Sequence, residues 1–449
     1  MGITTRTAVA CGVDIGSTNA KVVLIDAEGA VVARVIRPTP RDADGPLIDA
    51  RALLDAIEQM ILSACGDLYE VHAVSTAGIG EDGVLVDAAL TPLTRALSWF
   101  DPRRQTVFRD LQPRLRGTEP FDADSDPVRT FVGWVWAREQ LGETSAHRWI
   151  SLTDLPAAHW SGRPFLSDTL ASRTGAWHAS DRRWDADRVS STLGDVELLP
   201  PVAATGEVVG ALASARLREA GAVSAEAITV VGGHDHPIAG WGVDRMVPGA
   251  LLDSMGTAEV VVAQTAAPPA DYTRQPAIEI APGIRSSGTT VLRVEELARN
   301  VQWASQNPEV AGHIRGLLDG SAEPLPVLDS GWFVPGVHGG GQPAYALDAP
   351  ADPRARASAV LGALAIAGRE AVEAVRRGGA GDGEVRLAGG WARSPGWIDI
   401  KNAVNGYRAA PVLEPQVTAV GAALLAAEAL GWAPDPARAL GGFAADLLG

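Results

Sequence analysis

The first candidate site is a glycine-rich turn near the N-terminus that carries a carboxylate, two hydroxyls and a lysine. Glycines let a backbone turn tightly and present N–H donors to phosphate oxygens, and neighbouring hydroxyls add further donors. A carboxylate just before such a turn is suited to hold Mg²⁺, usually through water. The residues in question are Asp14, Gly16, Ser17, Thr18 and Lys21. A phosphate site is one interpretation, and a hairpin with an incidental aspartate is the other.

Lysine is nearly absent from the chain, which draws attention to Lys21. Lys21 and Lys401 are the only lysines among 38 basic residues. A compact ammonium required near Gly16 would explain a lysine there. A surface lysine at the end of a strand is the alternative.

A second candidate is the acidic turn Gly232-Gly233-His234-Asp235-His236, which ends an apolar run. A carboxylate in a glycine-flanked turn just past a buried strand is held firmly enough to act as a general base. Two alternatives stay open. One is a metal site at His234 and His236, for which the sequence shows no obvious third ligand, and the other is a plain polar turn.

Two further glycine turns lie in the second half of the chain. Gly389-Gly390 follows the apolar run 385–387 and precedes Ser394-Pro395, a pair that can open a helix. This turn has neither the spacing of a P-loop nor that of the Gly-x-Gly-x-x-Gly motif. The other turn, in Asp253-Ser254-Met255-Gly256-Thr257, repeats the pattern of residues 14–18.

Hydrophobic patterning predicts the elements that carry these turns. Residues 8–36 contain three apolar runs separated by turns, which indicates a meander of β-hairpins, and Asp49 then precedes a helical apolar pattern as an N-cap. A second meander is expected over 227–263, followed by helices at 353–377 and 418–430. The recurring order predicts two related lobes that meet near residue 245, with the two similar turns facing each other across a cleft.

Composition narrows the class of protein. The formal net charge is −16 with no basic block, which argues against binding to nucleic acid or to an anionic membrane surface. Cys11 and Cys65 are the only cysteines, too few for a disulfide framework or a thiolate zinc site. No apolar stretch has the length of a membrane span and no signal-peptide pattern is evident, so we expect a cytoplasmic protein.

Taken in order along residues 9–430, these motifs resemble those of the FGGY carbohydrate kinase family, within the actin-like, ribonuclease-H-like ATPase superfamily. The resemblance implies an α/β fold of two actin-like lobes with a central cleft. Residues 1–245 would carry the sugar site and the catalytic base, and residues 246–449 the nucleotide site.

The resemblance also assigns roles to individual residues. Asp235 is implied as the catalytic base and Asp14 as the Mg²⁺ site. Phosphate binding is implied for the first turn with Lys21 and for Gly256 and Thr257. The residues implied to bind the adenosine side of ATP are Gly389, Gly390, Ser394 and Asn402, extended by the helix from Thr418 to Leu430.

On the sugar side, the stretch from Trp99 to Arg103 is similar to the family's Trp-x-Asp-x-Arg motif, which points to Trp99 and Asp101. Xylulose kinases carry Gln-Met-His-Gly and glycerol kinases Gln-Arg-Glu-Thr at a position that contacts the sugar. This chain reads Ile-Gly-Glu-Asp-Gly over residues 79–83, so the resemblance puts Glu81 at that position. We expect Glu81 to accept hydrogen bonds from two substrate hydroxyls, with a solvated loop acid as the alternative. A second departure from the family pattern lies at residues 335–343, where many relatives have Gly-Glu-Arg and an aromatic residue. The resemblance therefore assigns no nucleotide or sugar contacts to that loop.

These implications predict an ATP-dependent kinase that transfers the γ-phosphoryl group to a hydroxyl of a small ketose, polyol or sugar acid, with ATP and Mg²⁺ as cofactors. The alternative within enzymes is a glycerol- or tetritol-type polyol kinase. A non-kinase actin-like ATPase and a sugar sensor without turnover are alternatives from other classes. The expected partners are the sugar and ATP, without nucleic acid or membrane, and a homodimer is left open.

Overall fold

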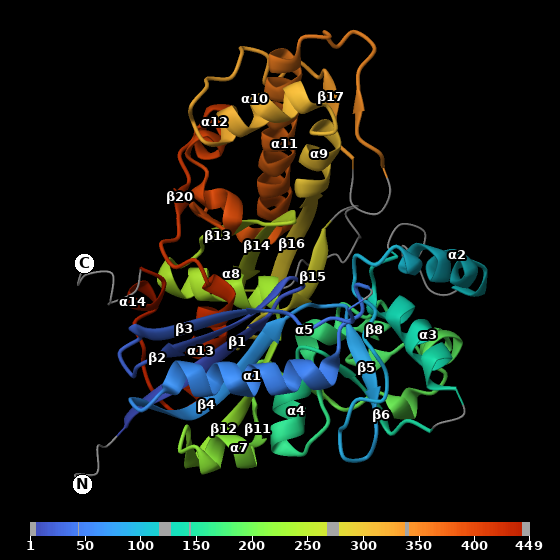
Figure 1. Ribbon diagram of the computed structural model, residues 1–449, viewed down its shortest axis with the longest axis vertical. Helices are drawn as coiled ribbons and strands as arrows, with labels where there is room; N and C mark the ends of the chain where they lie inside the picture. The colour runs from blue at the N-terminus through green and yellow to red at the C-terminus, as the bar shows by residue number, and fades with distance from the viewer. Residues whose placement is uncertain are drawn as a thin grey trace. The chain divides into compact units, whose positions relative to one another are not determined.

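The chain divides into two compact units, each built on a six-stranded sheet (Figure 1). The computed structural model describes residues 6–43, 45–115, 127–142, 145–266, 278–336 and 341–441. The first unit takes the described residues up to Gly242 together with 284–286 and 416–441, and the second takes the remainder of the described chain. No helix among the described residues is both long and apolar enough to cross a membrane.

The first sheet has the strand order β11-β12-β4-β1-β2-β3. An antiparallel meander of β1, β2 and β3 is extended by β4 and β12, which run parallel to β1, and by β11, which is antiparallel to β12. The meander confirms the pattern predicted for residues 8–36. The strands are β1 (Thr7–Ile15), β2 (Asn19–Ile25), β3 (Val31–Pro38), β4 (Tyr69–Gly78), β11 (Val208–Ala211) and β12 (Val223–His234).

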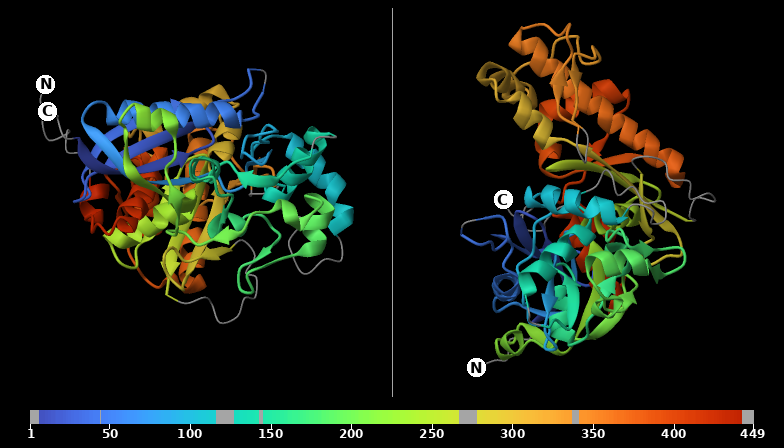
Figure 2. Two further views of the ribbon diagram at one scale, coloured as in Figure 1. Left: turned by 90° about the horizontal axis from the view of Figure 1, so that it is seen from below. Right: turned by 90° about the vertical axis from the view of Figure 1, so that its right-hand side faces the viewer.

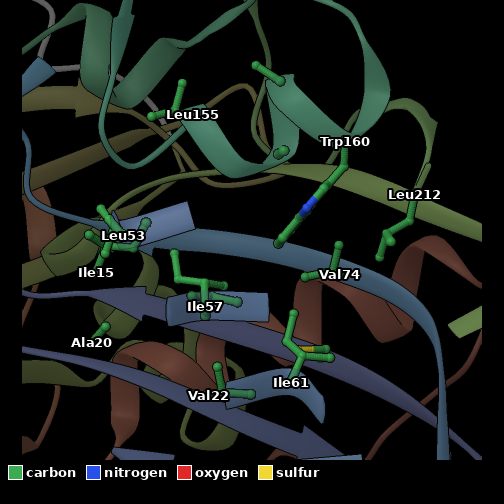
Figure 3. Packing of buried hydrophobic residues seen from close by; sticks show 14 of the residues in the cluster. Ile15, Ala20, Val22, Leu53, Ile57, Ile61, Val74, Leu155, Trp160 and Leu212 are labelled. Carbon is green, nitrogen blue, oxygen red and sulfur yellow. The ribbon is translucent and has the colours of Figure 1, made fainter. Parts of the chain in front are cut away.

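Helix α1 (Ala50–Cys65) covers one face of this sheet. It begins where predicted, because the Asp49 carboxylate accepts hydrogen bonds from the backbone N–H groups of Arg51 and Ala52. Its apolar side chains recur at helical spacing and join the core formed by alternate residues of the strands (Figure 3). The members labelled in Figure 3 include Leu53, Ile57 and Ile61 of the helix and Val22 and Val74 of the strands.

Helix α13 (Val417–Ala429) lies on the opposite face, against β1, β4 and β2 (Figure 2, left). It approaches β1 so closely that a Cβ on Gly12 would lie 1.9 Å from the carbonyl oxygen of Ala419. Cys11 and Val13 point to the α1 side, so Gly12 faces α13 through the alternation of the strand. The glycine at position 12 is therefore required for packing.

The second sheet has the order β15-β16-β14-β13-β19-β20. Here β13, β14 and β16 form an antiparallel meander, and β19 and β20 run parallel to β13. This repeats the plan of the first sheet, which confirms the predicted recurrence. The strands are β13 (Leu251–Met255), β14 (Ala258–Thr265), β15 (Glu279–Pro282), β16 (Thr289–Glu296), β19 (Val385–Ala388) and β20 (Ala410–Pro411).

Helix α11 (Pro353–Val375) packs along β14 and β16, and α9 (Ala298–Ala304), α10 (Pro308–Leu318) and α12 (Pro395–Asn405) pack against it or against each other. The long helices expected near 353–377 and 418–430 are thus confirmed as α11 and α13. The short β17 (Phe333–Val334) and β18 (Ala344–Tyr345) form a separate hairpin.

Two expectations about the division of the chain differ from the structure. The second meander does not begin at residue 227, because β12 pairs in parallel with β4 in the first sheet. That prediction was wrong because an apolar run does not specify its partner strand. The units divide at Gly242, close to the predicted 245, but the C-terminal residues 416–441 group with the first unit because α13 packs on its sheet.

The first unit has further short elements, of which α4 joins the core under α1 and α8 continues past Gly242 into the second unit. A second core of this unit contains Trp134 and Trp149, whose rings pack edge to face with their centroids 5.8 Å apart. The elements are α2 (Arg103–Leu115), α3 (Thr130–Leu141), α4 (Leu155–Ser161), α5 (Asp168–Ala171), α6 (Ala186–Thr192), α7 (Ala215–Glu219), α8 (Asp235–Met246), α14 (Pro436–Leu440), β5 (Gly83–Val86), β6 (Arg148–Ser151), β7 (Leu166–Ser167), β8 (Trp177–His178), β9 (Arg183–Trp184) and β10 (Val202–Ala203).

Candidate active site

Asp235 stands at the junction where β12 ends and α8 begins. Two glycines just before it allow the strand end to pack tightly. A Cβ on Gly232 would lie 2.0 Å from the carbonyl oxygen of Thr76, and one on Gly233, whose φ is +147°, would lie 2.1 Å from Oγ1 of Thr169. The same Oγ1 accepts a 3.0 Å hydrogen bond from the His234 backbone N–H. The backbone that carries Asp235 is thereby fixed.

The Asp235 carboxylate is partly buried and lies beside two imidazoles. Its Oδ1 accepts a 2.7 Å hydrogen bond from the His236 backbone N–H and lies 3.2 Å from Nε2 of His234 and 3.6 Å from Nε2 of His236. Burial raises the pKa of Asp235, and the charges of Asp14 and Glu81 act in the same direction, against His236. A carboxylate with a raised pKa is a better proton acceptor near neutral pH, as a general base must be.

The structure supplies the third metal ligand that the sequence did not reveal. Ligand atoms of His234, Asp235 and His236 lie within 4.8 Å of one another. Burial lowers the pKa of His234 far below its usual value, and the nearby charges of Arg173 and Arg129 reinforce this. His234 is therefore neutral, which suits a ligand, but the two guanidinium groups oppose a bound cation at the same place. The geometry of the three ligand atoms is therefore compatible with a metal ion, whereas the positive charges nearby disfavour one.

Glu81 is buried, so the alternative of a solvated loop acid is wrong. Its Oε1 accepts a 2.7 Å hydrogen bond from Nε of Arg173 and a second one from Nη2 of the same guanidinium. Gly80 brings this pair beside the imidazole, since a Cβ on Gly80 would lie 2.9 Å from Cδ2 of His234 and 3.0 Å from Cγ of Arg173. Glu81, Arg173 and His234 thus form one contact group next to Asp235.

The predicted sugar contacts Trp99 and Asp101 lie in a loop tied to the same region. Asp101 is almost fully buried, and Arg103 donates to both of its oxygens, at 2.9 Å from Nε and 2.6 Å from Nη2. Burial alone would raise the pKa of Asp101, but the hydrogen bonds from Arg103 outweigh it and lower the pKa. Trp99 is half-buried and packs against the first core. The Asp101 carboxylate is already engaged within the protein.

Arg104 joins this loop to the neighbour of Glu81. Its Nη2 lies 3.1 Å from Oδ1 of Asp82 and also donates to the Leu97 carbonyl oxygen at 2.8 Å, and its Nε donates to the Ser98 carbonyl oxygen at 3.0 Å. Arg104 is almost fully buried. Sequence reasoning missed both Arg104 and Arg173, because nothing in their local pattern distinguishes them from other arginines of this arginine-rich chain.

The first glycine turn joins β1 to β2. Asp14 and Lys21 face each other in this hairpin, with Nζ of Lys21 2.6 Å from Oδ2 of Asp14. Asp14, and to a lesser degree Asp235, raises the pKa of Lys21. The predicted Mg²⁺ ligand and the predicted phosphate-binding ammonium therefore pair with each other. Gly16 lies in the turn with Ser17 and Thr18, where Oγ1 of Thr39 donates to the Gly16 carbonyl oxygen at 2.7 Å.

The second unit carries the other predicted nucleotide-binding residues. Gly256 closes the β13–β14 turn by donating a 2.8 Å hydrogen bond to the Ala258 carbonyl oxygen, and Thr257 follows it. Gly256 and Gly390 both face open space at the position of a Cβ. Ser394 precedes α12 as its N-cap without a side-chain capping bond. A backbone that approaches a ligand closely needs such unobstructed glycines.

Asn402 has a partner within the protein. Its Oδ1 accepts a 3.0 Å hydrogen bond from the Ala409 backbone N–H, which ties α12 to the strand that follows it. This gives Asn402 a structural task that the sequence did not predict. Residues 337–340 of the loop at 335–343 lie outside the described residues.

Comparison with known proteins decides the family. A family model described as the FGGY family of carbohydrate kinases, N-terminal domain, matches residues 9–242. The chain belongs to the FGGY family of carbohydrate kinases. It is 30% identical to a xylulose kinase of Streptomyces coelicolor, over 58% of this chain and 55% of that protein. It is 28% identical to a glycerol kinase of Gloeobacter violaceus, over 95% of this chain and 89% of that protein.

A solved structure supports the fold of this FGGY chain. The gluconate kinase from Lactobacillus acidophilus superposes with a TM-score of 0.78 at 17% identity, over 96% of this chain and 91% of that one. The expected fold class is confirmed as α/β with two actin-like, ribonuclease-H-like lobes. FGGY membership makes the chain a phosphotransferase whose acceptor is an alcohol group. The three proteins named act on different acceptors, so the family alone does not identify the sugar.

Proposed function

We propose that this FGGY kinase transfers the γ-phosphoryl group of ATP to a hydroxyl of a small neutral sugar or polyol, and that Asp235 is its general base. The observation that carries the proposal is the setting of Asp235. Its backbone is fixed by the Gly232–Gly233 packing, it is partly exposed, and burial raises its pKa. A group so placed can take the proton of a hydroxyl as that hydroxyl attacks phosphorus.

The charges around Asp235 favour a neutral acceptor. His236 lowers the pKa of Asp235, whereas the charges of Asp14 and Glu81 raise it, so these two carboxylates disfavour a further negative charge beside Asp235. The guanidinium of Arg173, which lies beside His234, is engaged with Glu81. A substrate carboxylate placed there would be repelled, whereas hydroxyls can donate to carboxylate oxygens. A polyol or ketose is accordingly preferred over a sugar acid.

We propose that Glu81 uses one carboxylate oxygen for the protein and the other for the substrate. Its Oε1 serves Arg173, so the other carboxylate oxygen is the one proposed to accept a substrate hydroxyl. Arg173 holds the carboxylate in one orientation, which lowers the entropic cost of binding the sugar. Trp99 and Asp101 are proposed as further residues of this side, with Asp101 positioned by Arg103.

ATP is proposed to bind the second unit through Gly256, Thr257, Gly389, Gly390 and Ser394. The phosphates of ATP are proposed to bind also to the first glycine turn, at residues 16–18. Phosphoryl transfer passes through a loose transition state, so positioning and neutralisation of charge supply most of the acceleration. Glycine turns that offer backbone N–H groups serve both purposes. Lys21 is proposed to add its ammonium when it is released from Asp14.

Mg²⁺ is proposed to be held at Asp14, whose oxygen ligands suit this ion. Oδ2 of Asp14 accepts from Lys21, so the residues fit a hydrated ion held through water better than one bound directly. Bound Mg²⁺ would neutralise charge on the phosphates of ATP. When Mg²⁺ binds, Asp14 would exchange the ammonium of Lys21 for the hydrated ion. The buried carboxylate of Asp14 is then never left unpaired.

A substrate panel tests this proposal. ADP release is measured with ATP, Mg²⁺ and one of glycerol, xylulose, L-fuculose or gluconate, and also without any acceptor. We expect strong stimulation by a neutral member of the panel and little by gluconate. Rapid ADP release without an acceptor would favour an actin-like ATPase, and binding of a sugar without ADP release would favour a sensor.

A further inference from the structure

Lys401 is buried in the second unit, although lysine is rarely buried. It lies on α12 with 1% of its side chain exposed, and its Nζ is 2.7 Å from Oδ2 of Asp253. The same Nζ donates a hydrogen bond to Oε1 of Glu259, which is equally buried. One ammonium therefore holds two carboxylates in the interior of the unit.

The two carboxylates come from either side of one turn. Asp253 is in β13 and Glu259 is in β14, and the turn that connects these strands contains Gly256 and Thr257. In the register of this hairpin Met255 pairs with Glu259. Lys401 thus clamps both strands at the base of a turn proposed to bind the phosphates of ATP.

Two further contacts, both at Met255, connect the same turn to α12 and to the Gly389–Gly390 turn. Nε1 of Trp397, one helical turn before Lys401 on α12, donates a 3.0 Å hydrogen bond to Sδ of Met255. Gly389 has φ +86°, and a Cβ there would lie 2.2 Å from the carbonyl oxygen of Met255. The two turns therefore meet backbone to backbone, and α12 sets their relative position.

The ion cluster is closed on its other side by α11. A Cβ on Gly368 would lie 2.0 Å from Oε1 of Glu259 and 2.7 Å from Nζ of Lys401. Burial lowers the pKa of Lys401, but Asp253 and Glu259 outweigh it and raise the pKa, so the ammonium stays charged. Burial and the charge of Asp253 raise the pKa of Glu259 to about 8. A buried ion cluster adds little net stability, but it penalises any arrangement in which its members separate.

We propose that Lys401 is a positioning residue for nucleotide binding, which holds the Gly256–Thr257 turn and the Gly389–Gly390 turn in the arrangement that ATP requires. This rests on the proposed function, because it takes these two turns as the ATP site. Lys401 touches neither ATP nor the sugar, and acts through Asp253 and Glu259. Its loss should therefore change the affinity for nucleotide and leave the affinity for the sugar unchanged.

The variant Lys401→Met tests the proposal, because methionine keeps a long unbranched side chain without the ammonium. ADP with Mg²⁺ is titrated into the full chain by calorimetry. We expect the dissociation constant for ADP to rise about tenfold, the order of magnitude for loss of a residue that orients direct ligands. With the acceptor identified by the panel, the KM for ATP should rise similarly and the KM for the acceptor stay within about twofold.

Three companion variants separate positioning from stability. Glu259→Gln keeps the pair of Lys401 and Asp253 and serves if Lys401→Met fails to fold; it should weaken ADP binding by several-fold. Lys401→Met/Glu259→Gln removes the ammonium together with one of the two acids, so it should melt closer to the wild type than Lys401→Met does, without recovering the ADP affinity. Arg386→Met removes a basic residue from the neighbouring β19, where it pairs with Glu384, and is the matched control without effect on ADP binding.

The proposal is overturned if folded Lys401→Met, or Glu259→Gln in its place, binds ADP like the wild type, or if ATP and acceptor KM values rise together. These outcomes differ from failure of the proposed function. Wild-type protein that binds no nucleotide would remove the ATP site itself, whereas nucleotide binding weakened by Gly256→Ala but unaffected by Lys401→Met removes only the positioning role.

Discussion

At the scale of single residues, the molecule concentrates charge where water is scarce. Asp14 and Glu81 lie close enough to Asp235 for their charges to raise its pKa, and each of the three carboxylates has a basic or imidazole neighbour. Such an arrangement keeps carboxylates ready to accept protons or hydroxyl hydrogen bonds. The cost is that every one of these side chains depends on its partner.

Glu81→Gln tests the proposed sugar contact. Glutamine keeps the shape of the side chain, but it gives up the charge-assisted hydrogen bonds to a substrate hydroxyl and to Arg173. Loss of one such bond costs about 1.5–3 kcal/mol, so the KM for the acceptor should rise by more than about tenfold while the KM for ATP stays constant. Steady-state kinetics with each substrate varied in turn gives both values.

The matched control is Glu70→Gln, which alters a glutamate of the same unit that is one-third exposed and pairs with His72. It should change neither KM. Equal rises in both KM values for Glu81→Gln would show that Glu81 supports the fold of the site and does not contact the sugar.

Local patterns predicted which residues lie at turns, but they did not predict partners. Asp49 as an N-cap and the glycines at 232–233 and 389–390 were evident because their roles depend on neighbours in sequence. The pairing of Glu81 with Arg173 joins residues 92 positions apart, and that of Lys401 with Glu259 joins residues 142 apart. No single-sequence pattern encodes such a distance.

At the scale of elements, one plan is used twice. Each sheet has an antiparallel meander, and in each the first hairpin turn follows an aspartate and contains a glycine and a threonine. The repetition was predictable because period-two apolar runs and glycine turns mark hairpins. The sheet to which β12 belongs was not, and neither was the packing of α13 on the first sheet.

Gly12→Ala tests the contact between β1 and α13. The added methyl would lie 1.9 Å from the Ala419 carbonyl oxygen and 2.4 Å from the Ala423 nitrogen, and neither backbone atom can move without displacing the helix. Overpacking of this kind costs about 2 kcal/mol or more. Urea unfolding of the full chain should show that loss in the free energy of unfolding.

Gly45→Ala is the corresponding control, because no atom lies within 4 Å of the Cβ position there. It should unfold within about 0.5 kcal/mol of the wild type, as exposed substitutions usually do. If Gly12→Ala matched this control, α13 would not pack against β1 as described.

At the scale of the whole molecule, stability should depend on pH in an unusual direction. Asp154 is fully buried, and burial raises its pKa to about 8, although the Ser167 backbone N–H donates to Oδ2 at 2.8 Å. An aspartate in an unfolded chain has a pKa of about 3.9. The folded state binds the proton more tightly, so this contribution to stability is complete below about pH 4 and is lost as the pH rises through 8.

Asp154→Asn removes this titration. Between pH 6 and pH 9 the free energy of unfolding of the wild type should fall by about 2–3 kcal/mol more than that of the variant. Burial also raises the pKa of Asp82, to about 7, so the remaining slope of the variant has the same sign. Parallel curves for the two proteins would mean that Asp154 is ionised in the folded state.

The central claim is that Asp235 accepts the proton of the sugar hydroxyl, and Asp235→Asn tests it most directly, since asparagine keeps the shape and cannot take the proton. Turnover is measured with saturating ATP and the acceptor from the panel, and calorimetry with ADP and with the acceptor shows whether binding survives. We expect turnover to fall by about 10²-fold or more, with the affinities for ADP and for the acceptor both retained. Turnover close to that of the wild type would contradict it.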